Sequence, residues 1–191
     1  MSELILDPQT TALVLIDLQK GIVPLAAGPH SGADVVTRSV RLIEAFRRKK
    51  APVVLVHVGF LDGKDALAPQ ADAVSHSASS FPAGWDEFVP EIVPQPGDIL
   101  IKKRQWSAFT GTELDLQLRR RGIKTIVLAG IATHIGVEST ARIAYELGYE
   151  QVFVEDATSS LSAEAHAASM KFIFPRMGRI RTTSEVEQAF S

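Results

Sequence analysis

Short apolar runs rich in β-branched residues recur along the chain, and each is too short for a helix and typical of a strand buried on both faces. The runs are Thr11–Asp17, Pro52–Val58, Asp98–Lys102, Lys124–Ala129 and Gln151–Glu155, and Gly178–Thr182 adds a short edge strand. Segments with helical spacing are Asp34–Lys49, Thr112–Arg121, Gly136–Gly148, Ser162–Phe174 and Ser184–Phe190. This alternation of strands and helices predicts a parallel sheet with helices on both faces.

The right-handed crossover rule and the six strands favour the strand order 3-2-1-4-5-6, which is a three-layer Rossmann-like α/β sandwich. The order reverses between the first and fourth strands, so we expect Asp17 and the turn at Gly136 to be neighbours at the carboxyl edge of the sheet. With 191 residues, the chain has the size of one domain, residues 1–191. No G-x-G-x-x-G fingerprint follows the first strand, which argues against a nicotinamide enzyme.

A long segment from Gly59 to Gly97 has no sustained period and contains several prolines. We interpret it as an excursion over the carboxyl edge of the sheet, with a short helical piece near Trp85–Phe88. Loops of this length in compact domains tend to be functional.

Composition excludes several classes of partner and site. The formal net charge is −2 with mixed signs, so we expect no nucleic-acid partner. No apolar run approaches the length of a membrane span and no early segment is typical of a signal peptide, which predicts a cytoplasmic protein without a membrane partner. The chain contains no cysteine, which excludes a disulfide and a thiolate metal site. Its histidines show no ligand spacing, so we expect no metal and no other cofactor.

The segment from Lys124 to Arg142 reads as a strand, a tight turn and the start of a helix, with G-I-A-T-H-I-G-V-E-S-T-A-R beginning at Gly130. It resembles the turn of the isochorismatase-like hydrolases, also called the cysteine hydrolase superfamily, whose pattern is roughly G-[IV]-A-T-x-x-C-V-x-x-T-A-R. Gly136 stands at the position of the nucleophilic cysteine. I-D-L-Q at Ile16–Gln19 and K-x-x-x-S-A-F at Lys103–Phe109 match the family motifs that supply the acid and the lysine of its triad.

The resemblance implies a catalytic set of Asp17, Lys103 and Gly136. It also implies a non-proline cis peptide between Ile131 and Ala132, which aims the backbone N–H groups of Ala132 and Gly136 at a developing oxyanion. True isochorismatases likewise lack the cysteine, and their turn contains A-H-[IV]-G, which resembles this chain from the histidine onward. In those enzymes the aspartate protonates a vinyl ether carbon, and water adds to the resulting oxocarbenium ion.

Further candidates for substrate binding flank these motifs, with an ordinary structural role open for each. They are Gln19, Phe60, Trp106, Phe109, Ile131, Ala132 and His134. Aromatic residues such as Phe60, Trp85, Trp106 and Phe109 either wall a small pocket or pack in the core. His134 either orients a substrate or caps a helix.

Two functions remain open from the sequence. The first is a hydrolase that acts on a small anionic substrate by Asp17 general acid/base catalysis, with isochorismate-type vinyl ether hydrolysis as the leading hypothesis. The second is a family member that has lost catalysis and binds a small molecule or a partner. The pKa of Asp17 distinguishes them, because a working acid needs a raised pKa and a structural partner of Lys103 a lowered one. The resemblance also implies a homodimer or homotetramer.

Overall fold

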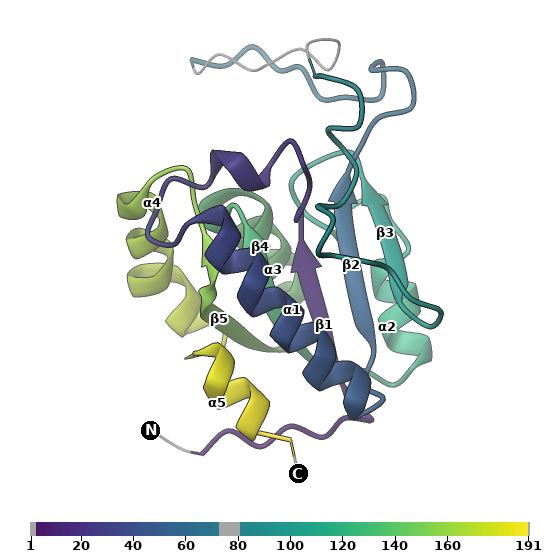
Figure 1. Cartoon of the computed structure of the whole chain (residues 1–191), viewed down its shortest axis with the longest axis vertical. Helices are drawn as coiled ribbons and strands as arrows, with labels where there is room; N and C mark the ends of the chain where they lie inside the picture. The colour runs from purple at the N-terminus through teal and green to yellow at the C-terminus, as the bar shows by residue number, and fades with distance from the viewer. Residues whose placement is uncertain (1–2, 73–80, 191) are drawn as a thin grey trace.

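The computed structural model describes residues 3–72 and 81–190 and contains a six-stranded parallel sheet (Figure 1). The strands are β1 Thr11–Ile16, β2 Val53–Val58, β3 Ile99–Lys103, β4 Thr125–Ile131, β5 Glu150–Ser159 and β6 Arg179–Arg181. Their order is β3-β2-β1-β4-β5-β6 and each neighbouring pair is parallel. The predicted α/β fold and strand order are therefore confirmed.

Five α-helices and several shorter helical turns connect the described strands. The α-helices are α1 Gly32–Arg48, α2 Leu114–Arg120, α3 Glu138–Glu146, α4 Ala163–Ala168 and α5 Thr183–Gln188. The shorter turns are η1 Val23–Leu25, η3 Thr133–Val137, η4 Ser169–Ile173 and η5 Phe174–Arg176. None of the helices in the described residues is long and apolar enough to cross a membrane.

Two separate hydrophobic cores lie on the two faces of the sheet, because successive side chains of a strand point to opposite faces. Leu13 and Leu15 of β1 share one core with buried residues of α1 and α5. Val14 and Ile16 share the other core with α2 and α3. Figure 1 shows α1 and α5 in front of the sheet, which matches this division. The result is a three-layer arrangement in which β1 is completely buried.

The predicted starts of two helices are corrected by the structure. Helix α1 begins at Gly32 rather than at Asp34, because the hydroxyl of Ser31 accepts a hydrogen bond from the Asp34 N–H at 3.1 Å and caps the helix. Helix α2 begins at Leu114, whose N–H donates to the hydroxyl of Thr112 at 3.2 Å.

The predicted helical piece near Trp85–Phe88 is wrong. Two consecutive turns replace it, in which the Trp85 N–H donates to Pro82 O and the Glu87 N–H donates to Gly84 O. Gly84 has φ +75, a left-handed value that interrupts a right-handed helix. Phe88 then pairs with Gln19 in an isolated β-bridge, so this end of the excursion lies against the segment that follows β1.

After β4, the structure also differs from the strand and helix predicted from the sequence. Strand β5 continues to Ser159 rather than Glu155, because a register shift between Leu128 and Gly130 lets Thr158 and Ser159 pair with the end of β4. The segment Ser162–Phe174 is not one regular helix, since α4 passes into the π-helical turn η4 and then into η5. Part of the predicted excursion, residues 73–80, lies outside the described residues.

Candidate active site

Asp17 follows β1 directly and has φ +53, a left-handed backbone conformation that costs a non-glycine residue about 1–2 kcal/mol. Its N–H donates to Val56 O on β2 at 3.0 Å, and its carbonyl accepts from the Gln19 N–H at 2.8 Å. These bonds fix the turn at the carboxyl edge of the sheet. Backbone strain held in this way is a feature of functional sites.

Lys103 ends β3 and forms a buried ion pair with Asp17. Its Nζ donates to Asp17 Oδ2 at 2.7 Å and to the carbonyl of Gln105 at 3.2 Å. The side chains of Lys103 and Asp17 are only 3% and 8% exposed. Because β2 lies between β1 and β3, the long lysine side chain crosses the end of β2 to reach the carboxylate.

Burial raises the pKa of the Asp17 carboxyl above its usual value of 3.8, and the attraction of the Lys103 ammonium opposes this rise without cancelling it. The second carboxyl oxygen, Oδ1, is buried and has no hydrogen-bond partner among the described residues. A buried carboxyl with one oxygen uncommitted is suited to hold and transfer a proton.

The turn after β4 lies against this pair. The peptide between Ile131 and Ala132 is cis, as the sequence motif implied. A Cβ added to Gly136 would stand 3.2 Å from Asp17 Oδ2 and 3.0 Å from Ile16 Cγ2. The predicted proximity of Asp17 and Gly136 is confirmed, and the missing side chain leaves space beside the carboxyl.

A cavity of ≈ 300 Å³ opens over these groups. Seven of the ten catalytic and substrate-binding residues proposed from the sequence line it, and they are Asp17, Phe60, Lys103, Trp106, Ile131, Ala132 and Gly136. They come from the carboxyl ends of β1, β2, β3 and β4, where ligands of open parallel sheets bind.

Three proposed binding residues lie outside the lining of this cavity. Gln19 is fully buried and bonds β2 through both amide atoms, with Nε2 donating to Val58 O and Oε1 accepting from the Val58 N–H, each at 2.8 Å. Phe109 packs in the core with its ring 5.7 Å from that of Tyr149. The ring Nδ1 of His134 lies 2.5 Å from the Ser160 hydroxyl.

Part of the apolar lining was not predicted from the sequence. Ile22, Leu25, Leu67, Phe81, Ile135 and Leu161 also line the cavity. Most of these residues lie in loops, where an isolated apolar residue has no periodic signal. Trp85, one of the aromatic candidates, does belong to the lining.

The hydroxyl of Thr133, in the turn after β4, lies beside a histidine that the sequence does not reveal as its partner. The Thr133 hydroxyl lies 2.8 Å from Nδ1 of His166, and Nε2 of the same ring lies 3.5 Å from Oε1 of Glu155. Thr133 is fully buried and lies outside the cavity lining. His166 is distant in sequence, so no local motif links the two residues.

Charged groups elsewhere near the site pair with one another. Arg104 Nε donates to Asp65 Oδ2 at 2.8 Å, and Arg142 pairs with Glu138 one helical turn earlier. Within the described part of the chain, no cluster of three or more His, Cys, Asp or Glu residues could hold a metal ion.

The model of the isochorismatase domain matches residues 11–185. The chain belongs to the isochorismatase family. It is 55% identical over 186 residues to the isochorismatase family protein YwoC of Bacillus subtilis, with 97% of this chain and 96% of that protein covered. It is also 32% identical over 208 residues to the ureidoacrylate amidohydrolase RutB of Caulobacter vibrioides, with 96% and 92% covered.

A solved isochorismatase family structure from Burkholderia thailandensis has the same fold over nearly all of its length. The TM-score is 0.93 at 49% sequence identity, and the alignment covers 98% of each chain. The chain is thus a member of the isochorismatase-like hydrolase family.

Proposed function

We propose that the chain is a hydrolase in which Asp17 acts as a general acid and base without a cysteine nucleophile. The observation that supports this most directly is the buried Asp17 carboxyl, with a raised pKa, one oxygen bound to Lys103 and the other unpartnered among the described residues. A carboxyl that keeps its proton closer to neutral pH can donate it to a bound substrate.

The proposal places the chain in a subgroup with glycine at the nucleophile position. Thiolate attack on an amide is excluded because the chain contains no cysteine. The Thr133 hydroxyl does not substitute for it, since Thr133 is buried and lies outside the cavity lining. We therefore do not propose for this chain the amidohydrolase activity that the name of RutB carries.

Hydrolysis of a vinyl ether in a small anionic molecule is the reaction that best fits an acid without a nucleophile. Asp17 gives its proton to the terminal vinyl carbon, and the ether carbon becomes an oxocarbenium ion. Water adds to that carbon and loses a proton to the Asp17 carboxylate, and the hemiketal then separates into a ketone and an alcohol. No covalent bond to the protein forms at any step.

The other groups of the site would assist in defined ways. Lys103 holds the carboxyl in position and limits how far burial raises its pKa. Gly136 leaves the space in which the vinyl group meets Asp17. The backbone N–H groups of Ala132 and Gly136 would donate hydrogen bonds to an oxygen of the substrate.

The test measures pyruvate release from two vinyl ethers, isochorismate and 2-phenoxyacrylate. We expect turnover of at least one of them by the wild type and its loss in Asp17→Asn, while Asp72→Asn, an exposed acid, serves as the matched control. Lys103→Ala should lower kcat strongly as well. Turnover that persists in Asp17→Asn would overturn the proposal.

The alternative is a binding protein that has kept the fold and lost catalysis. It is favoured by the same glycine, because the family's reactive position carries no reactive group in this chain. This alternative predicts ligand binding to the folded protein with no pyruvate from either vinyl ether. We also expect a homodimer or homotetramer, which size-exclusion chromatography with light scattering would test.

A further inference from the structure

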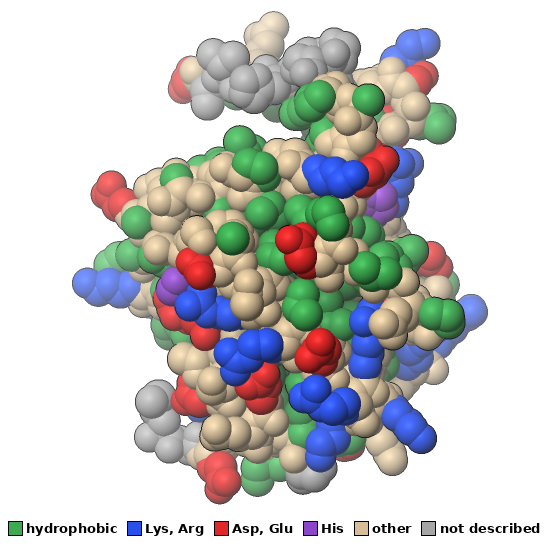
Figure 2. Space-filling view, in the orientation of Figure 1, with side chains coloured by type: hydrophobic (Ala, Val, Ile, Leu, Met, Phe, Trp, Pro, Cys, Tyr) green, Lys and Arg blue, Asp and Glu red, His purple; other side chains and the backbone are tan. Residues whose placement is uncertain are grey.

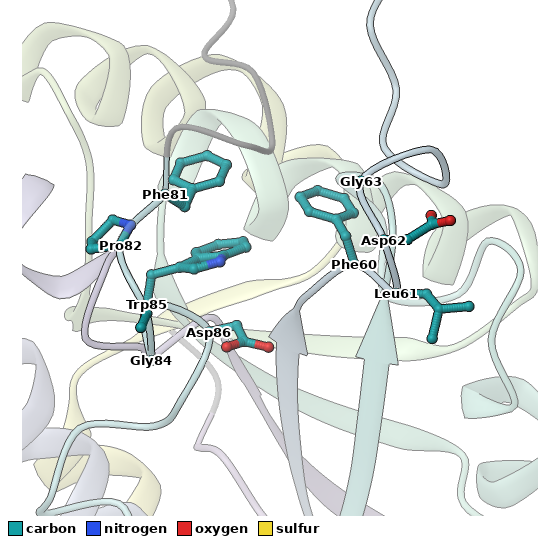
Figure 3. Close-up of a pocket in the computed structure, with 10 residues that line it drawn as sticks. Phe60, Leu61, Asp62, Gly63, Phe81, Pro82, Gly84, Trp85 and Asp86 are labelled. Carbon is teal, nitrogen blue, oxygen red and sulfur yellow. The ribbon is translucent and has the colours of Figure 1, made fainter.

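An aromatic wall forms one side of the active-site cavity. Phe81 stacks on Trp85 with ring centroids 4.2 Å apart and planes at 23°, and Phe60 lies 5.8 Å from Trp85 at 30°. Figure 3 shows the Phe60 ring directed toward Phe81 and Trp85, while Leu61 and Asp62 point away from these rings. The wall also borders a second cavity of ≈ 440 Å³.

The remainder of the lining is also mainly apolar. Leu25, Leu67, Trp106 and Leu161 line the cavity and are exposed to solvent, so they form an apolar rim around its opening. In Figure 2, hydrophobic side chains gather toward the carboxyl end of the sheet, and charged side chains dominate the opposite end. An exposed apolar rim around a cavity is typical of a site for a ligand with an apolar body.

The cavity has few charged groups, and among its described lining residues Arg104 is the cation with the most uncommitted donors. Lys103 is committed to Asp17 Oδ2 and to the carbonyl of Gln105. Arg104 also lines the cavity, and Asp65 engages only its Nε. The two terminal nitrogens of Arg104 have no hydrogen-bond partner among the described residues. Two parallel N–H groups of this kind match a carboxylate.

We propose that the substrate is a small molecule with one flat, apolar ring and a single carboxylate, which places its ring against Phe60, Phe81 and Trp85 and its carboxylate on Arg104. This inference rests on the proposed function, because it names the substrate class of the same site. The cavity volume of ≈ 300 Å³ lies at the lower end of ligand pockets and fits one ring with a short substituent.

The same arrangement selects against two other classes of molecule. A linear dicarboxylate offers nothing to the aromatic wall and needs a second free cation. A neutral ring compound offers the terminal nitrogens of Arg104 no charged acceptor. The inferred substrate therefore differs from isochorismate, which carries two carboxylates.

The test compares four probes by isothermal titration calorimetry at neutral pH, namely benzoate, cyclohexanecarboxylate, benzamide and succinate. We expect benzoate to bind at millimolar concentration or below, with succinate and benzamide at least about tenfold weaker. Cyclohexanecarboxylate should bind less well than benzoate, because it cannot stack on the wall. Absence of benzoate binding, or equal binding of succinate, would overturn the proposal.

Two variants identify the groups responsible. Arg104→Gln should weaken benzoate about tenfold and leave benzamide unchanged, whereas Arg142→Gln, an exposed arginine outside the cavity, should change neither. Trp85→Leu should weaken both aromatic compounds, benzoate and benzamide. Equal benzoate affinity in Arg104→Gln and wild type would show that the carboxylate does not lie on Arg104.

The outcome is separable from that of the proposed function. Benzoate binding is read without turnover, so it can succeed while neither vinyl ether reacts, and then only the catalytic proposal fails. Turnover of a vinyl ether that depends on Asp17, without any preference for a ring or for one carboxylate, would reject the substrate class alone.

Discussion

Replacement of Lys103 by methionine should destabilise the fold in a pH-dependent way. The variant keeps most of the side-chain volume but leaves the Asp17 carboxyl, 8% exposed, without its cation. Removal of one partner from a buried ion pair costs about 3–5 kcal/mol, because the remaining charge stays desolvated. We expect a loss of this size in the free energy of unfolding at pH 8.

The loss should shrink as the pH falls. Without Lys103 the main opposition to the effect of burial is lost, so the folded pKa of Asp17 rises further above the usual value of 3.8. Between 3.8 and that raised value, the folded state binds a proton that the unfolded chain does not. The free energy of unfolding of Lys103→Met therefore falls as the pH rises, by up to about 1.4 kcal/mol per pH unit.

Urea unfolding of wild type and Lys103→Met at pH 5, 6.5 and 8 measures this effect. The double variant Asp17→Asn/Lys103→Met is the control, since it removes both charges and should recover most of the lost stability with a smaller pH dependence. A Lys103→Met variant that loses less than about 1 kcal/mol at pH 8, with the slope of the wild type, would refute the reasoning.

Three further outcomes follow from the site and its surroundings. Gly136→Ala should lower vinyl ether turnover at least about tenfold, because its Cβ would stand 3.2 Å from Asp17 Oδ2 in the space of the substrate; steady-state pyruvate release checks this. Thr133→Val should cost about 1–3 kcal/mol in urea unfolding, because Nδ1 of buried His166 loses its partner. Burial lowers the pKa of His166 below its usual 6.5, so in that pH region the unfolded chain binds more protons than the folded protein. The free energy of unfolding should therefore fall as the pH drops through this region. His166→Asn should reduce this pH dependence, as measured by urea unfolding at pH 5 to 7.

Much of the fold follows from local pattern in the sequence. Strands such as β1 and β4 are apolar on both faces, and parallel strands joined by right-handed crossovers leave few possible orders. The end of β5 could not be placed in this way, because it depends on a register shift against β4. The turns around Trp85 were also missed, although Pro82 and Gly84 are residues that favour turns over a helix.

In the candidate site too, residues in local motifs were predicted, and residues whose role depends on tertiary packing were not. Motifs at strand ends located Asp17, Lys103 and Gly136 together, because the carboxyl ends of adjacent strands meet at one edge. Roles were harder to assign to residues whose side-chain orientation depends on packing. Gln19 bonds to the β2 backbone and Phe109 packs in the core, and no periodicity distinguishes these roles from substrate binding. The pairing of Thr133 with His166 likewise depends on the fold alone.

The measurement that tests the central claim most directly is the titration of the Asp17 carboxyl carbon by ¹³C NMR, with Asp17→Asn used to assign its signal. The acid mechanism requires a midpoint clearly above the usual 3.8, in the direction that burial gives to the pKa of this group. A midpoint at or below 3.8 would mean that Lys103 holds Asp17 as a permanent carboxylate. That result would contradict the assignment of Asp17 as the proton donor.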